Sequence, residues 1–329
     1  MQVTIKNWGK MPDGQTTKLY TIKNDHMEFT ISDLGGIITS ILAPDKNGVF
    51  GEVCLGYDTV DDYLADNAYV GAMVGRYSNR TAKGRLVING VEYQLTQNEG
   101  ETHLHGGGVW NKKLWQTEVL ENGVLLSYHS PDGECGYPGN VDAYIKVTLE
   151  GKQIIMDFKA VADKDYYLSL TNHAYFNLRG AGEGNVLSHQ IIINANKYTP
   201  LAGTEQIPTG EIADATGTQN DFTELKEIKY DNHDLNYILN SGNLAAEVVE
   251  PVSGRVLKVI TDLPCIQFYT AEKMTEHKGR NGQIYGKNSG FCLEPQYYPN
   301  ACNIPAFPSG FKLAGEEYEH VIIFEFDTK

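Results

Sequence analysis

Apolar and polar residues alternate along much of the chain, in short stretches. The alternation covers residues 27–31, 85–95, 115–128, 141–158, 191–193, 255–260 and 321–326. Successive side chains of a β-strand point to opposite faces of a sheet, so this spacing predicts half-buried strands. The pattern therefore indicates a protein built mainly from short strands.

Turn-forming dipeptides separate three pairs of these stretches: Asn89-Gly90, Asn122-Gly123 and Glu150-Gly151. Gly, and to a lesser degree Asn, tolerates the positive φ that tight two-residue turns require. We therefore expect an antiparallel hairpin, with positive φ in its turn, at each place.

One short helix is indicated, at residues 59–66, and no longer amphipathic helices alternate with the strands. This excludes parallel α/β folds. No repeat and no Pro- or Ser-rich linker divides the chain, so we expect residues 1–329 to form one all-β domain, a large antiparallel β-sandwich. The polar, Gly-rich segments 180–184 and 276–289 are expected to be surface loops.

Composition narrows the functional classes. Lys and Arg number 27 against 42 Asp and Glu, a formal net charge of −15, which opposes binding to a nucleic-acid backbone. The sequence contains neither an apolar signal segment nor a membrane-spanning stretch, so we expect a cytoplasmic protein with no membrane partner. Its five cysteines have no C-x-x-C spacing, which favours reduced, buried thiols over disulfides or a zinc site.

Two polar clusters in the first third of the chain could bind a ligand. Asn79 and Arg80 lie in an Arg-rich segment, where a guanidinium could grip two neighbouring oxygens or simply remain solvated. His103 and His105 precede three glycines, and a strand would place both imidazoles on one side. A metal site, a metal-free ligand site and structural histidines all remain open for this pair.

Further candidates follow later in the chain. His173 and Tyr175 belong to TNHAYFNL, Asp234 precedes Asn-Tyr, and Gln267 lies in IQFYTA. Glu294 comes just after an apolar strand, where its surroundings could tune its proton affinity, or where it could be an exposed residue at a strand end. No Gly-rich phosphate-binding signature is present, which argues against nucleotide chemistry.

Taken in order, these motifs resemble the galactose mutarotase (aldose 1-epimerase) family across residues 20–326, and TNHAYFNL is the most diagnostic of them. The resemblance implies a large one-domain β-sandwich that needs no cofactor and interconverts the α and β anomers of a free aldohexose such as galactose or glucose. It also implies that His173 is the general acid and Glu294 the general base. We then expect a bell-shaped pH dependence, with the acid limb from the carboxylate and the alkaline limb from the imidazolium.

The same resemblance implies a set of sugar-binding residues: Asn79, Arg80, His105, Tyr175, Asp234 and Gln267. The chain departs from the family pattern in a shortened segment after His105 that contains Trp110-Asn111-Lys112, and at Leu235 and Pro295. We expect these departures to affect hydroxyl preference rather than the acid and base.

Three other functions compete with this one. A metal-dependent, cupin-like enzyme would use His103, His105, His173 and Glu294 as ligands. A catalytically silent sugar-binding or regulatory module could share the fold, although it has no need for both an acid and a base. A relative acting on phosphorylated hexoses is opposed by the negative net charge. The preferred hypothesis names a small aldose as the partner, with no metal.

Overall fold

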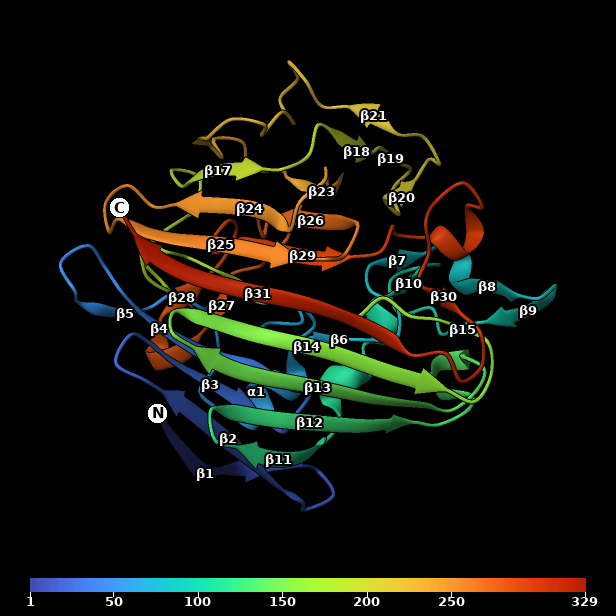
Figure 1. Cartoon of the computed structure of the whole chain (residues 1–329), viewed down its shortest axis with the longest axis horizontal. Helices are drawn as coiled ribbons and strands as arrows, with labels where there is room; N and C mark the ends of the chain where they lie inside the picture. Colours follow the sequence, from blue (N-terminus) through green and yellow to red (C-terminus); the bar gives the residue numbers. More distant parts are fainter.

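The computed structural model describes all 329 residues, and its largest element is a nine-stranded antiparallel sheet. This sheet faces the viewer in Figure 1, from β11 near the bottom to β17 near the top. Its strands, in spatial order, are β11 (Gln116–Leu120), β12 (Gly123–Ser130), β13 (Val141–Glu150), β14 (Gln153–Ala162), β31 (Tyr318–Thr328), β25 (Arg255–Thr261), β24 (Leu244–Val249), β17 (Gln190–Ile193) and β22 (Lys226–Glu227).

Two five-stranded antiparallel sheets pack against the large sheet. The first contains β1 (Gln2–Lys10), β2 (Thr16–Lys23), β3 (Glu28–Ser32), β4 (Ile38–Pro44) and β5 (Phe50–Glu52). The second contains β21 (Ala213–Asp214), β18 (Lys197–Thr199), β23 (Asp234–Ile238), β26 (Cys265–Tyr269) and β29 (Cys292–Gln296).

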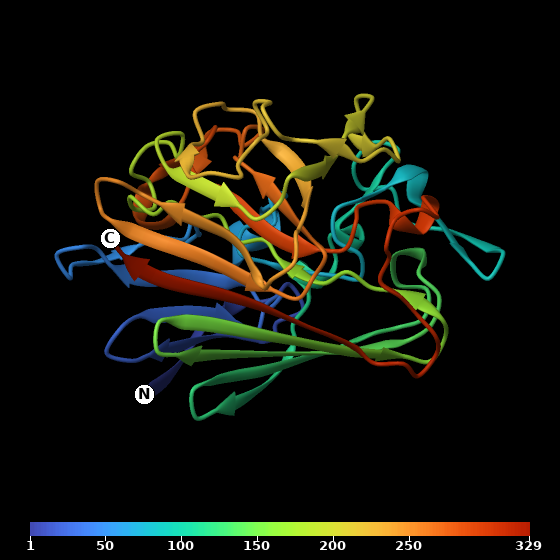
Figure 2. The same ribbon diagram turned by 45° about the horizontal axis from the view of Figure 1, so that its top comes forward.

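The apolar faces of the three sheets share one core of 52 buried residues, which makes the fold the predicted large β-sandwich. In Figure 2 the blue N-terminal strands lie beside the green strands β13 and β14 of the large sheet. Isolated bridges from Phe176 to Cys54 and to Phe291 join the two smaller sheets.

Short ribbons and turns complete the chain. The two-stranded ribbons are β6 (Met73–Val74) with β16 (Thr171–Asn172), β7 (Arg80–Thr81) with β10 (His103–Leu104), β8 (Arg85–Ile88) with β9 (Val91–Gln94), β15 (Tyr166–Tyr167) with β30 (Phe311–Lys312), β19 (Leu201–Ala202) with β20 (Ile207–Pro208), and β27 (His277–Lys278) with β28 (Ile284–Tyr285). Single 3₁₀ turns are η1 (Ala82–Gly84), η2 (His105–Gly107), η3 (Trp110–Lys112), η4 (Glu134–Gly136), η5 (Arg280–Gly282) and η6 (Ala301–Asn303).

The predicted helix is present as α1 (Val60–Ala65). Thr59 caps it, because its hydroxyl accepts a hydrogen bond from the Asp62 amide at 3.2 Å. Val60 and Tyr63 are buried, and the helix ends at Asp66. No helix of the structure is long and apolar enough to cross a membrane.

All three predicted hairpins are present, as β8–β9, β11–β12 and β13–β14. Asn89 and Gly90 adopt positive φ as expected, but Gly123 does not. Gly123 is the first residue of β12, and a Cβ atom there would lie 2.0 Å from the Val147 carbonyl oxygen. Close strand packing, rather than turn geometry, therefore requires a glycine at this position.

The prediction of a surface loop holds for residues 180–184 but fails for much of 276–289. The second segment contains β27, η5 and β28, and Tyr285 is fully buried. The Arg280 guanidinium forms an ion pair with Glu52. The polar sequence of residues 276–289 does not reveal this packing, because the Glu52 carboxylate lies more than two hundred residues away along the chain.

All five cysteines are free thiols, as expected. Cys54, Cys265 and Cys292 are buried, whereas Cys135 and Cys302 are only half-buried.

Candidate active site

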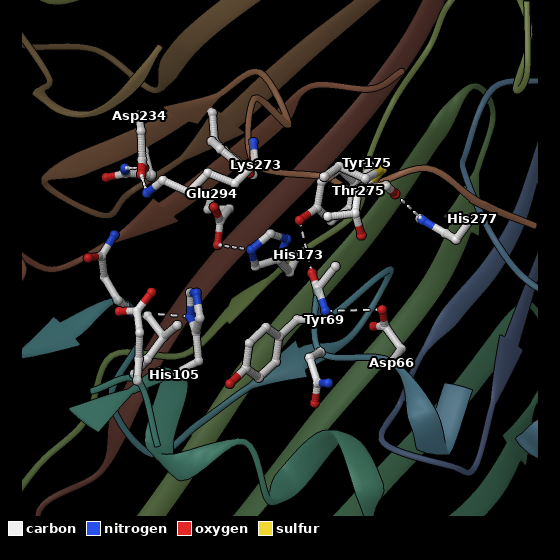
Figure 3. Close-up of a pocket in the computed structure, with 18 of the residues that line it drawn as sticks. Asp66, Tyr69, His105, His173, Tyr175, Asp234, Lys273, Thr275, His277 and Glu294 are labelled. Atoms are coloured by element: carbon white, nitrogen blue, oxygen red, sulfur yellow. Dashed lines mark hydrogen bonds and ion pairs between the residues drawn. The ribbon is translucent and has the colours of Figure 1, made fainter. Parts of the chain in front are cut away.

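An open cleft of about 530 Å³ lies over the second five-stranded sheet (Figure 3). Its lining contains all eight residues that the sequence predicted for the site: Asn79, Arg80, His105, His173, Tyr175, Asp234, Gln267 and Glu294. They come from six separate parts of the chain, so the fold brings them together.

Strand register determines which side chains of the second five-stranded sheet face the cleft. Glu294 of β29 lies directly opposite Gln267 of β26, which lies opposite Asn236 of β23. Because side chains alternate along a strand, these residues share one face of the sheet. Their neighbours Leu293 and Phe268 point to the other face and pack in the core.

Glu294 is a buried residue in the middle of β29, not an exposed residue at a strand end. Its Oε2 atom has no hydrogen-bond partner. Burial, and then the nearby Asp234 carboxylate, raises the pKa of Glu294 well above 4.5. The carboxyl group therefore holds a proton more tightly than an ordinary Glu.

His173 follows the short strand β16 and faces Glu294 (Figure 3). Its Nε2 atom lies 3.6 Å from Glu294 Oε2, and its Nδ1 atom lies 3.6 Å from the Cys292 sulfur. Burial lowers the pKa of His173 to about 4. Burial therefore favours the uncharged form of each group, a protonated Glu294 carboxyl and a neutral His173 imidazole.

His105 occupies the 3₁₀ turn η2 with a φ of +49°. The Asn79 amide donates to its Nδ1 atom at 3.2 Å, so the ring proton of neutral His105 resides on Nε2. Burial, together with the neighbouring His173 and Arg80, lowers the pKa of His105 well below 6.5. This imidazole is consequently a neutral donor.

His103 and His105 do not share a ligand site, contrary to the expectation for a continuous strand. The strand ends at Leu104, and the positive φ of His105 redirects the chain. His103 Nδ1 donates to the Thr96 carbonyl oxygen at 2.6 Å, while Nε2 accepts from the Tyr137 hydroxyl at 2.7 Å. Both nitrogens of His103 are thus engaged outside the cleft.

The glycine at position 106 is required by close packing of the backbone. Its φ is +66°, and a Cβ atom there would lie 1.8 Å from the Gly75 carbonyl oxygen.

Arg80 and Asp234 form a polar network at one end of the cleft. The Arg80 guanidinium donates to both oxygens of Glu99, at 2.7 and 3.1 Å, and lies 3.8 Å from Asp234. Asp234 also accepts from the Gln267 amide at 2.6 Å and lies 3.3 Å from the Lys273 ammonium. These groups hold one another in place and offer several donors and acceptors to a ligand.

The ring of Tyr175 lies beside His173, whereas its hydroxyl is engaged by the backbone. The ring stacks on His173 with centroids 5.0 Å apart, and the hydroxyl donates to the Ala68 carbonyl oxygen at 2.9 Å.

Sequence reasoning missed several lining residues, among them Tyr69, Glu99, Lys273 and His277. Tyr69, Glu99 and Lys273 lie outside the regular strands and helices, and His277 begins the two-residue strand β27, so none of them belongs to a recognisable sequence pattern. The only signal in the sequence for Glu99 is its acidic side chain, which could pair with Arg80.

The departures from the family pattern at Leu235 and Pro295 lie on strands of the cleft sheet but do not line the cleft. Leu235 packs against the core, and Pro295 is buried. Trp110 is likewise buried in the core. None of these three residues lines the cleft, so any effect on hydroxyl preference would have to act through their neighbours.

Three residues could together hold a metal ion. One ligand atom each from His105, His173 and Glu294 lies within 4.8 Å of the others. A four-ligand site that includes His103 does not form, since both its nitrogens are engaged. The remaining donors could bind zinc only by moving closer together, because zinc–nitrogen bonds are about 2.0 to 2.1 Å long.

Comparisons with known proteins agree with this geometry. A profile of the family described as aldose 1-epimerase matches residues 18–325. Galactose mutarotase of Sus scrofa is 39% identical over an alignment of 341 positions, which covers 100% of this chain and 99% of that protein. Aldose 1-epimerase of Haemophilus influenzae is 35% identical and covers 96% and 97%, respectively.

The crystal structure of an aldose epimerase homologue from C. elegans superposes with a TM-score of 0.89 at 28% identity, covering 94% of this chain and 98% of that chain. The chain therefore belongs to the aldose 1-epimerase family.

Proposed function

We propose that the protein is an aldose 1-epimerase, an isomerase that interconverts the α and β anomers of free aldohexoses such as galactose and glucose. The observation that carries the proposal is the contact of His173 Nε2 with Glu294 Oε2, at 3.6 Å, inside a polar cleft. Family membership gives independent support.

Anomerisation needs an acid and a base that act side by side. The ring opens when a base removes the proton from the C1 hydroxyl while an acid protonates the ring oxygen, and the C1–ring oxygen bond breaks. Both oxygens are attached to C1, so the two catalytic groups must lie near each other. His173 and Glu294 meet that requirement.

In the proposed reaction the proton of the pair first lies on His173, so that Glu294 can take the C1 hydroxyl proton while His173 donates to the ring oxygen. Rotation about the C1–C2 bond of the open aldehyde exposes its other face, and the reverse proton transfers close the ring. Each positioned group typically contributes ~10²- to 10⁴-fold. No electrons leave the sugar and no group is transferred, so the chemistry requires no cofactor.

The remaining polar residues are proposed to hold the sugar hydroxyls. Arg80 can donate, Asp234 can accept, and Gln267 can do both. Neutral His105 offers its Nε2 proton. Asn79 accepts from the Arg80 amide through Oδ1 at 2.8 Å, so its NH₂ group is the part that can donate to a ligand. Tyr175 offers an aromatic surface beside His173.

Polarimetry of freshly dissolved α-galactose and α-glucose tests the proposal and the sugar preference together. The protein should accelerate the decay of optical rotation towards the same equilibrium value. A folded protein that binds sugar without accelerating the decay would instead be a silent sugar-binding module.

Metal dependence is tested separately, because His105, His173 and Glu294 could approach one ion. Exhaustive chelation should leave the rate unchanged. A loss of activity that zinc or manganese restores would assign these residues to a metal site.

We further propose that residues 1–329 form a single domain in the cytoplasm, with a neutral sugar rather than nucleic acid as partner. The shared 52-residue core and the family match over residues 18–325 support one domain. The five free thiols suit a reducing compartment. The net charge of −15 opposes binding to polyanions.

A further inference from the structure

Tyr69 lines the cleft in a backbone conformation that residues other than glycine rarely adopt. Its φ is +58°. The flanking backbone is fixed on both sides: the Ala68 carbonyl accepts from the Tyr175 hydroxyl at 2.9 Å, and the Val70 amide donates to Asp66 at 3.0 Å. Rare backbone conformations that the surroundings impose are concentrated at functional sites.

The ring of Tyr69 contacts both cleft histidines. Its centroid lies 6.0 Å from that of His173, with an interplanar angle of 24°, and 4.7 Å from that of His105. Tyr175 stacks on His173 at 5.0 Å and 26°. In Figure 3 the His173 imidazole lies between the two tyrosine rings.

The hydroxyl of Tyr69 ties this ring to the segment that carries His105. Asn98 Nδ2 donates to the hydroxyl at 3.1 Å. The same Asn98 side chain accepts from the Leu104 amide at 2.8 Å and donates to the Leu104 carbonyl oxygen at 3.0 Å.

We propose that Tyr69 is a positioning residue, which fixes the plane of the His173 imidazole against Tyr175 and stabilises the imidazolium form that donates the proton. The inference rests on the proposed function, in which His173 is the acid.

The stabilisation follows from electrostatics. A buried imidazolium has lost most of its hydration, and the negative face of an aromatic ring within roughly 6 Å attracts a cation. The other groups that face His173 are the Glu294 carboxyl, the Cys292 thiol, His105 and, farther away, Asp234. Of these, the Asp234 carboxylate favours the cation by its charge, and the tyrosine rings are proposed to supply further support.

Two substitutions separate the ring from its hydroxyl. Tyr69→Phe keeps the ring and removes the hydrogen bond with Asn98, and should retain kcat within about twofold. Tyr69→Leu removes the aromatic face, while an unbranched Cβ leaves the backbone conformation equally accessible. It should lower kcat at least about threefold with KM changed less than twofold.

Titration of ¹⁵N-labelled His173 by NMR is the decisive readout. A cation–π loss of the usual size corresponds to a fall of roughly half a unit in the pKa of His173 in Tyr69→Leu, with no shift in Tyr69→Phe. This titration needs no turnover, so it tests Tyr69 even if the protein does not anomerise sugars.

Tyr128→Leu is the matched control. Tyr128 is also a half-buried tyrosine, stacks on Trp115 at 5.3 Å and lies outside the cleft. It should lower the melting temperature and leave kcat and the His173 titration unchanged. If Tyr69→Leu fails to fold, Tyr69→Met replaces it with the same expectations.

Three results would overturn the inference. The first is a folded Tyr69→Leu variant with an unshifted His173 titration. The second is a Tyr69→Phe variant as impaired as Tyr69→Leu, which would assign the effect to the hydroxyl. The third is a loss confined to KM, which would make the ring a sugar-binding surface instead.

Discussion

His173 Nε2 and Glu294 Oε2 face each other across 3.6 Å, and both side chains are almost fully buried. The Oε2 atom has no hydrogen-bond partner, so the contact is not a structural ion pair with saturated partners. A polar pair of this kind is costly to bury, and it is ready to exchange protons with a ligand that enters the cleft.

Substitution of the two residues singly and together should show that they act as a unit. Glu294→Gln removes the base and His173→Asn removes the acid, so each should lower kcat by ~10²-fold or more with little change in KM. The double variant should be little worse than the worse single variant. Loss of either group already prevents the coupled proton transfer, so loss of the second has little further effect. If the two variants fold and the losses in kcat multiply in the double variant, His173 and Glu294 do not act as a unit.

The pH dependence of kcat should be bell-shaped, with its limbs assigned differently from the sequence-based expectation. Activity requires one proton on the pair, and burial places that proton mainly on Glu294. The rate should fall below about pH 4, where His173 takes up a second proton, and fall again at alkaline pH as Glu294 loses its own. Recovery of activity on return to neutral pH excludes unfolding as the cause.

Asp234→Ala should weaken sugar binding and also shift the alkaline limb. Loss of a charge-assisted hydrogen bond costs about 1.5 to 3 kcal/mol, which raises KM roughly 10- to 150-fold. Because the Asp234 charge raises the pKa of Glu294, its removal should move the alkaline limb to lower pH. Asp157→Ala, which loses a surface carboxylate paired with Lys146, is the matched control and should alter neither quantity. An unchanged KM in Asp234→Ala would remove this residue from the sugar site.

Stability should decrease on the acid side through histidines outside the cleft. Burial lowers the pKa of His103 and of His189 to about 4, against 6.5 for an exposed histidine. The unfolded chain therefore binds protons first, so stability is lost as the pH falls from about 6.5 to 4, by up to about 3 kcal/mol per residue. Urea unfolding at several pH values measures how the free energy of unfolding changes with pH, and His189→Gln should make this dependence weaker. If His189→Gln leaves this pH dependence unchanged, His189 does not contribute to the loss of stability at acid pH.

The elements that could be predicted from sequence are those set by local patterns. Asn89-Gly90 forms its turn because the two residues themselves tolerate positive φ, and Thr59 caps α1 through a neighbour three residues on. Motif resemblance identified the eight polar cleft residues. Neither source showed that Glu294 is buried opposite Gln267, because strand register depends on the whole sheet.

Other features required the tertiary structure. His103 and His105 are two residues apart, yet a single positive φ separates their environments. Tyr69 stands in no motif, and its role becomes visible only where its ring meets His173. Leu235 and Pro295 depart from the family pattern next to site residues, but strand alternation turns them away from the cleft.

Exchange NMR on an equilibrium mixture of galactose anomers tests the central claim most directly, because it detects interconversion without any change in concentration. The wild-type protein should produce exchange cross-peaks between the α and β anomeric protons, and folded Glu294→Gln should reduce their build-up rate by ~10²-fold or more. Equal exchange rates for the two proteins would place the base elsewhere. No exchange above the protein-free rate in the wild type would contradict the proposed activity itself.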